Sequence, residues 1–198
     1  MPKIVDHDER RAHIVEALMR LIVRDGFERA TMREIAAEAG YAHGAIARYF
    51  PDKQSVLTAA FQRLHTQAND RILAGVEGLR GLDALREMCL EILPFGEAGP
   101  RYAKVVLAFW DHAAQDREIW EIHREHNLRW RQLMHRFLGE ARDDGELAEG
   151  IDIATAVNEV SARNAGWQMI AVLMPDEAGD AHLDQGLDAL LDRFRARR

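Results

Sequence analysis

TMREIAAEAGYAHGAIARYFPDK, residues 31–53, predicts two short helices joined by a tight turn. Glu34 follows Thr31 by three residues, the spacing at which the two side chains cap a helix start reciprocally. An apolar stripe at helical spacing follows, made of Ile35, Ala36 and Ala39. Gly40 then ends the first helix, because glycine enters the left-handed conformation at little cost. The second helix is expected over residues 42–50.

The residue types in this pair of helices fit a DNA-binding helix-turn-helix. Ala36 is small where the two helices would touch, Gly40 opens the turn, and Ile46 fills the space between the helices. Two helices joined by a short turn that contains glycine can place the second helix in the major groove of DNA. On pattern alone, a helical hairpin without a ligand is an equal alternative.

An overlapping run, AGYAHGAIARYFPDKQSVL, resembles the DNA-binding domain of TetR-family transcriptional regulators. The resemblance covers about residues 14–57 and rests on the glycine turn, the Tyr-Phe pair and the lysine three residues after that pair. It implies a ligand-responsive repressor that binds an inverted-repeat operator as a homodimer and is released by a small molecule.

The resemblance also implies which residues contact DNA. Thr31 and Arg33 match positions that touch phosphate or adjacent bases, and Lys53 matches a phosphate contact at a helix start, where an anion is favoured. The groove-facing surface of the recognition helix matches His43, Ala45, Arg48 and Tyr49, and Gly44 is expected to let the backbone approach DNA. The fork of Arg48 could bond O6 and N7 of a guanine or hold a phosphate, and both roles stay open.

Two positions depart from the family pattern. Ala42 stands where a serine is common before the recognition helix, which removes a side-chain cap. Ala47 stands where a tyrosine is common, which removes one aromatic phosphate contact. The operator sequence therefore cannot be predicted from the family.

The charge distribution separates the amino-terminal third from the rest of the chain. The net charge is −7 over 198 residues, but residues 1–64 hold ten Lys or Arg against nine Asp or Glu. The acidity therefore belongs to the remainder of the chain. Arg33, Arg48 and Lys53 are expected to act locally, as contacts to individual phosphates.

Composition predicts an all-α protein, since strand-like alternation is absent and only five prolines are present. We expect a three-helix DNA-binding domain over residues 1–52, with Phe27 in its core and a first helix over about residues 8–25. A larger helical ligand-binding and dimerisation domain should follow over residues 53–198. No secretory segment and no bilayer-spanning apolar run is visible, which favours a cytoplasmic protein. The single cysteine, Cys89, excludes an internal disulfide and reads as a core residue.

The last two helices, expected over about residues 153–174 and 182–195, carry more apolar residues than one face needs. The excess surrounds Val160, Trp167 and Leu187. A helix that is apolar all round is buried, so a partner chain is implied. TetR-family proteins pair their last two helices as a four-helix dimer interface, and the resemblance extends that arrangement to this chain.

A second resemblance covers the segments VLAFWDHAAQDREIW, residues 106–120, and HNLRWRQL, residues 126–133. They are similar to the regulatory domain of the BetI-like branch, which is named for a choline-responsive repressor. The four tryptophans could form an aromatic box for a quaternary amine. Ordinary core aromatics at helical spacing are the favoured alternative.

Three pairs of a polar and an aromatic residue, spaced by three along a helix, predict the lining of a ligand pocket. Each pair puts a hydrogen-bonding group beside an aromatic ring, the composition of many small-molecule sites. The pairs are Phe109 with His112, Asn127 with Trp130, and Asn164 with Trp167. For any one polar group, satisfaction by a neighbouring backbone group is the alternative.

Two other classes of protein are alternatives, a metal-dependent helical enzyme and an adaptor that does not bind DNA. A helical-bundle metal enzyme needs Glu-x-x-His motifs, yet none of the nine histidines has Glu three residues before it. An adaptor would lack the combination of Arg48, Tyr49 and Lys53. We therefore expect no enzymatic activity, no metal and no cofactor.

Overall fold

A computed structural model describes residues 3–196 of the chain, with side chains from residue 7 onward. In that range the structure is helical apart from turns and one isolated antiparallel bridge between Leu147 and Arg195. The all-α prediction is confirmed. The elements are α1 Lys3–Asp25, α2 Met32–Glu38, α3 His43–Ile46, α4 Lys53–Gly75, α5 Gly81–Ile92, α6 Gly99–Gln115, α7 Arg117–Asp143, α8 Ile153–Leu173, η1 Pro175–Glu177 and α9 Asp180–Phe194.

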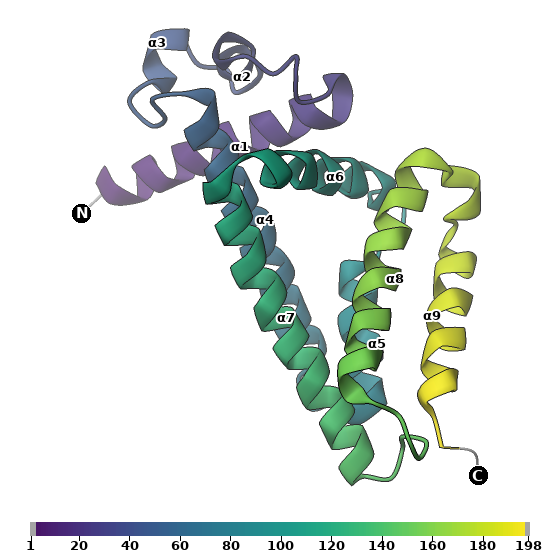
Figure 1. The fold of residues 1–198 in the computed structure, drawn as a ribbon. Coiled ribbons are helices and arrows are strands. Elements are labelled where there is room, and N and C mark those ends of the chain that lie inside the picture. Colours follow the sequence, from purple (N-terminus) through teal and green to yellow (C-terminus); the bar gives the residue numbers. More distant parts are fainter. Residues whose placement is uncertain (1–2, 197–198) are drawn as a thin grey trace. The chain divides into compact units, whose positions relative to one another are not determined.

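The chain divides into two compact units, and the division does not follow the order of the helices, which are labelled in Figure 1. The first unit comprises Met1–His65 and Lys104–Ile122, and the second comprises Thr66–Ala103 and His123–Arg198. The helices α4, α6 and α7 each contribute residues to both units. Residues 104–115, which make up most of α6, and residues 117–122 at the start of α7 therefore belong with the helix-turn-helix.

The local signals at α2 are formed as the sequence predicts. Thr31 Oγ1 accepts a hydrogen bond from the Glu34 backbone N–H at 3.3 Å, and Glu34 Oε2 accepts one from the Thr31 N–H at 2.8 Å. At the other end, Gly40 has a φ of 73°. The Tyr41 N–H donates to the Ala36 carbonyl at 2.8 Å, which completes a Schellman motif.

Two helix boundaries in the first unit differ from expectation. The first helix begins at Lys3, five residues before the expected start. The recognition helix α3 ends at Ile46, although helix was expected to residue 50. Tyr49 and Phe50 both donate their backbone N–H to the Ile46 carbonyl at 2.9 Å, so the chain tightens into a turn. Pro51 follows, and a residue before proline is biased away from helix.

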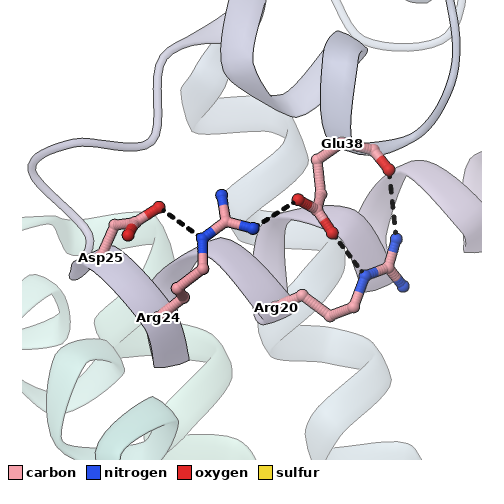
Figure 2. A network of polar contacts seen from close by, with 4 residues as sticks. All are labelled: Arg20, Arg24, Asp25 and Glu38. Atoms are coloured by element: carbon pink, nitrogen blue, oxygen red, sulfur yellow. Dashed lines mark hydrogen bonds and ion pairs between the residues drawn. The ribbon is translucent and has the colours of Figure 1, made fainter.

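A network of charged side chains ties α1 to α2 (Figure 2). Glu38 accepts hydrogen bonds from Arg20 Nε at 2.8 Å and from Arg24 Nη1 at 2.9 Å. Arg24 Nε also donates to Asp25 at 2.8 Å. These bonds hold the pKa of Glu38 below its ordinary value. The carboxylate therefore stays charged and fixes α2 against α1.

The expected role of Phe27 in the three-helix core is wrong. Phe27 is only half-buried and lies in the turn between α1 and α2. The core of the first unit is made by fully buried residues that include Ile14, Leu18, Leu21, Ile35, Ile46, Phe50, Leu57 and Phe61. The ring of Phe27 instead contacts the side chains of Lys53 and His112.

In the second unit, α8 and α9 run side by side, joined at the top by η1 (Figure 1). Val160 and Leu187, taken from the sequence as part of an apolar excess, are fully buried within the chain's own core. The same core contains residues of α5 and α7. Burial of these two residues therefore does not require a partner chain. Among the described helices, none combines the length and the apolar character needed to cross a membrane.

Candidate functional site

The surface formed by α2 and α3 presents most of the expected DNA-contacting residues. Arg33, His43, Gly44 and Arg48 are exposed, and Ala45 is half-buried. Within the described part of the chain, the side chains of Arg33, His43 and Arg48 make no hydrogen bond or ion pair. Their polar groups are therefore available to phosphates or base edges.

Tyr49 is less free than Arg48, because α1 holds it. Its hydroxyl accepts a hydrogen bond from Arg10 Nη1 at 3.2 Å, and its ring lies 4.8 Å from the ring of His7. Arg11 Nη1 donates to the Tyr49 carbonyl at 2.5 Å and places its guanidinium 4.2 Å from the Phe50 ring centre. Sequence reasoning missed these contacts between α1 and the residues that follow α3, because the contacting residues lie almost forty positions apart in the chain.

Lys53, the expected phosphate contact, has its ammonium on the turn between α1 and α2. Nζ donates to the Phe27 carbonyl at 2.8 Å and lies 3.7 Å from the centre of the Phe27 ring. Partial burial lowers the pKa of Lys53, while Glu28 and Glu34 act in the opposite direction. The ammonium is thus held at a defined point beside the first turn of α4.

Two of the six expected ligand-binding residues belong to the first unit. Phe109 is fully buried and packs against Phe61, with ring centres 4.9 Å apart. His112 is half-buried, and its ring meets that of Phe27 edge-on at 3.7 Å. Burial is the largest cause of the lowered pKa of His112. The sequence had placed both residues in the ligand-binding domain, whereas their contacts here are with the helix-turn-helix side.

The other four expected ligand-binding residues belong to the second unit. Asn127 and Trp130 lie on α7, and Asn164 and Trp167 lie on α8. Asn164 is buried, and its Nδ2 lies 3.7 Å from Cys89 Sγ on α5. No described residue bonds its Oδ1. A buried carbonyl oxygen without a hydrogen-bond partner destabilises the folded state. Asn164 Oδ1 can therefore accept a hydrogen bond from a further donor.

Gln168, four residues after Asn164, is a polar residue that the sequence reasoning missed. Its Nε2 donates to the Ile92 carbonyl at 2.6 Å, at the end of α5 where helix carbonyls lack partners. That bond fixes the orientation of the amide and leaves Oε1 buried, with no partner among the described residues. The i, i+4 spacing places Gln168 on the same face of α8 as Asn164 and could have identified it. The predicted pairs, however, combine a polar residue only with an aromatic residue three positions away.

Trp167 packs closely against α9. A Cβ built on Gly186 would lie 2.9 Å from Cζ2 of its indole. Its Nε1 is buried and has no hydrogen-bond partner in the described range. The polar atoms of Asn164, Trp167 and Gln168 thus lie within five positions of α8.

An open cleft in the second unit lies elsewhere on the chain. Its volume is about 1020 Å³, and it is lined by the turn after α7 and the end of α9, including Arg142, Leu147 and Arg193. None of the expected ligand-binding residues lines it. In the described residues, no group of three or more His, Cys, Asp or Glu could hold a metal ion.

Comparison with known proteins identifies relatives of both parts of the chain. Residues 14–60 match the family described as bacterial regulatory proteins, tetR family, and residues 81–196 match the BetI-type transcriptional repressor, C-terminal family. The second match alone covers more than half of the chain.

Two characterised regulators are similar in sequence. The HTH-type transcriptional regulator PksA of Bacillus subtilis is 34% identical over 122 residues, which cover 61% of this chain and 60% of PksA. The chain thus matches less than two thirds of that relative's length. The HTH-type transcriptional regulator BetI of Escherichia coli is 28% identical over 145 residues, or 72% of this chain and 73% of BetI.

A solved structure shares the fold along nearly the whole chain. It is a transcriptional regulator from Saccharomonospora viridis in complex with choline, with a TM-score of 0.89 and 22% sequence identity. The alignment covers 96% of this chain and 100% of that one.

Proposed function

Because the chain belongs to the TetR family of bacterial regulatory proteins, we propose that it is a ligand-responsive repressor of transcription. It binds an inverted-repeat operator as a homodimer and releases the operator when a small molecule binds the second unit. Operator binding places its action in the cytoplasm, beside the chromosome. Its relatives are regulators of transcription, and no reaction is proposed for it.

The surface of α2 and α3 carries the proposal of DNA binding. Arg48 is exposed two residues beyond the recognition helix α3, and in the described structure its side chain makes no internal bond that would have to break. Arg33 and His43 share this availability, Gly44 and Ala45 leave room for the backbone to approach DNA, and the Thr31 hydroxyl can donate while it caps α2. Two such surfaces related by a dimer axis would meet half-sites a helical turn, or a multiple of one, apart.

The test measures the salt dependence of binding to a duplex selected by the protein from a randomised library. The Arg48→Ala variant should flatten the slope of log K against log salt by about 1.8 if each protomer loses one phosphate contact. If Arg48 reads guanine instead, one base position should relax by about 1–3 kcal/mol. The matched control is Arg101→Ala, which removes an exposed arginine from the second unit and should change neither quantity. Wild-type affinity that does not respond to salt would exclude DNA binding.

Dimerisation through α8 and α9 rests on apolar side chains that the chain itself leaves exposed. Leu173 is 70% exposed and Met169 is 46% exposed. A stripe at i, i+4, i+7 and i+11 runs along one face of α8 and consists of Ala162, Gly166, Met169 and Leu173. Small residues in such a stripe allow close approach of a second helix, and a second copy of the chain is the proposed occupant.

Light scattering tests the dimer. The double variant Met169→Glu with Leu173→Glu should be monomeric, because two buried charges would face each other across the interface. Leu79→Glu, a change at a 40%-exposed leucine outside α8 and α9, is the matched control and should remain dimeric. A double variant that stays dimeric at micromolar concentration would contradict this interface.

The effector site is proposed in the second unit, around the buried polar atoms of α8. Asn164 and Gln168 each have an acceptor oxygen that no described residue bonds, and Trp167 has a similarly unbonded donor. Trp130 and Asn127 on α7 complete the proposed lining. A ligand that satisfies the acceptors gains hydrogen bonds worth more than their exposed counterparts, because the unpaired groups are already desolvated.

Fluorescence of the tryptophans during titration with metabolites tests this site. The Gln168→Leu variant should lose affinity for any true effector, whereas Gln132→Leu, at an exposed glutamine of α7, should not. For a 100-fold loss of operator affinity, the coupling is about 2.7 kcal/mol, and operator must weaken the effector by the same factor. A ligand whose affinity is unaffected by saturating operator is not the effector.

A further inference from the structure

Three side chains from separate segments meet on the ring of Phe27. Phe27 lies in the turn between α1 and α2, Lys53 opens α4, and His112 stands near the end of α6. The Lys53 ammonium lies 3.7 Å from the ring centre, and the His112 ring meets the same ring edge-on at 3.7 Å between centres. All three residues belong to the first unit.

The contact with Phe27 restricts the Lys53 side chain without exhausting its donors. A lysine ammonium has three N–H donors, and the Phe27 carbonyl takes one at 2.8 Å. The ring adds a cation–π attraction. A free lysine side chain loses rotamer entropy when it is fixed. Lys53 has already been fixed, and two donors are left for a phosphate at the start of α4.

The ring of Phe27 is not held by a helix of its own. It follows Gly26, which has a φ of 82°, and lies outside both α1 and α2. His112 packs against it from α6, and a second link runs alongside: Gln54 Nε2 donates to Asp116 Oδ2 at 3.0 Å. The first two residues of α4 are therefore attached to the end of α6 through Phe27 and His112, and to Asp116, the residue after α6, through Gln54.

We propose that His112 is a positioning residue for DNA binding, which acts by holding Phe27 so that Phe27 holds the Lys53 ammonium ready for a DNA phosphate. The inference rests on the proposed DNA-binding function and adds a residue of α6 to it. Movement of the end of α6 away from the α1–α2 turn would then remove one prepared phosphate contact from each protomer. In that arrangement the protein would bind the operator more weakly and displace fewer counterions from the DNA.

The experiment measures the salt slope of operator binding for the full-length protein on a duplex selected from a randomised library by the wild type. The Lys53→Ala variant should flatten the slope by about 1.8 for a dimer. The His112→Ala variant should weaken binding and flatten the slope in the same direction, by a smaller amount. The His112→Phe variant keeps a ring against Phe27 and should restore the wild-type slope.

A double variant separates positioning through Lys53 from a general structural role. Lys53→Ala combined with His112→Ala should bind no more weakly than Lys53→Ala alone, since the second change acts only through Lys53. Phe27→Leu provides a second route, because it keeps the backbone carbonyl and removes the ring, and should also flatten the slope. His135→Ala, at an exposed histidine of α7, is the control and should have no effect.

The outcomes distinguish the inference from the function on which it rests. If the wild type selects no duplex or shows no salt slope, the DNA-binding proposal fails. If Lys53→Ala changes the slope but neither His112→Ala nor Phe27→Leu does, the positioning role is overturned and DNA binding stands. Additive losses in the double variant would likewise overturn it. Thermal melts of each variant identify those that fail to fold. If either His112→Ala or Phe27→Leu fails to fold, the salt slope of the other variant decides whether the positioning role holds.

Discussion

Trp167 of α8 and Gly186 of α9 approach each other so closely that a Cβ on the glycine would lie 2.9 Å from Cζ2 of the indole. Glycine inside a helix costs about 1 kcal/mol relative to alanine, so Gly186 weakens α9 considered alone. The close approach explains its presence, since any larger residue must displace a rigid ring between the two helices proposed to form the dimer interface.

Gly186→Ala should therefore destabilise the protein although it favours helix. We expect a loss of about 1–3 kcal/mol in the free energy of unfolding, as for other overpacked sites, measured by urea denaturation. Gly139→Ala in α7 is the matched control, because a Cβ there meets nothing within 4 Å. That change should stabilise by about 0.5–1 kcal/mol. Equal effects from the two variants would contradict the packing of Trp167 on Gly186.

Stability should fall as the pH decreases below the ordinary histidine pKa of about 6.5. Burial is the main cause of the lowered pKa values of His112, His123 and His126. At His112 the Lys53 charge adds to burial, and Asp111, Glu28 and Asp116 oppose it. The unfolded chain then binds more protons than the folded one in this range, so the free energy of unfolding rises with pH.

Thermal melts between pH 8 and pH 5 check this prediction. The melting temperature should be level at the upper end and should decline as the pH falls through 6.5 toward the lowered pKa values. His123→Gln with His126→Gln should make the decline shallower. A melting temperature that is constant from pH 7 to pH 5 would show that these histidines titrate alike in both states.

The Glu38 network should stabilise the first unit in a way that salt weakens. The Glu38→Gln variant keeps one acceptor oxygen but removes the charge that Arg20 and Arg24 share, so its melting temperature should be lower. The difference from wild type should shrink as ionic strength rises, because partly exposed ion pairs are screened. Glu97→Gln, at an exposed glutamate without a partner in the described structure, should leave the melting temperature unchanged.

The Cys89 thiol should be unreactive toward alkylating reagents in the folded protein. Burial raises the pKa of its thiol to about 12, against a smaller opposite effect of the hydrogen bond to Asn164. Only the thiolate reacts readily, and this one is also inaccessible. Alkylation at pH 8 should therefore be slow in buffer and rapid in urea, tracking unfolding. Rapid alkylation of the native protein would contradict the packing of α5 on α8.

The features that the sequence predicted correctly depend on residues close together in the chain. The capping box of Thr31 and Glu34 and the turn at Gly40 each need only four or five neighbouring positions, so spacing suffices to find them. The burial of Cys89 was likewise visible in the surrounding apolar run. Periodicity also predicted the last two helices, expected over about residues 153–174 and 182–195, to within two residues at each end.

The features that sequence reasoning missed depend on contacts between distant segments. Lys53 and Phe27 are separated by 26 positions, and Gln168 and Ile92 by 76. No spacing rule connects such pairs. Apolar periodicity also cannot tell which neighbour covers a residue: Val160 and Leu187 are covered by their own chain, while Leu173, in the same pair of helices, is left exposed.

The bonds from Arg20 and Arg24 to Glu38, together with the closed turn at Gly40, leave α1, α2 and α3 little freedom to shift against one another. Because these three helices keep their arrangement, the DNA-contacting surface should keep its base preference whether or not effector is present. Apart from the Lys53 contact, what an effector can alter is the distance between the two DNA-contacting surfaces of the proposed dimer, and that distance must match the spacing of the half-sites along the duplex. Operators with lengthened or shortened spacers should therefore differ in how strongly effector releases them, while substitutions inside a half-site should cost the same with effector as without it.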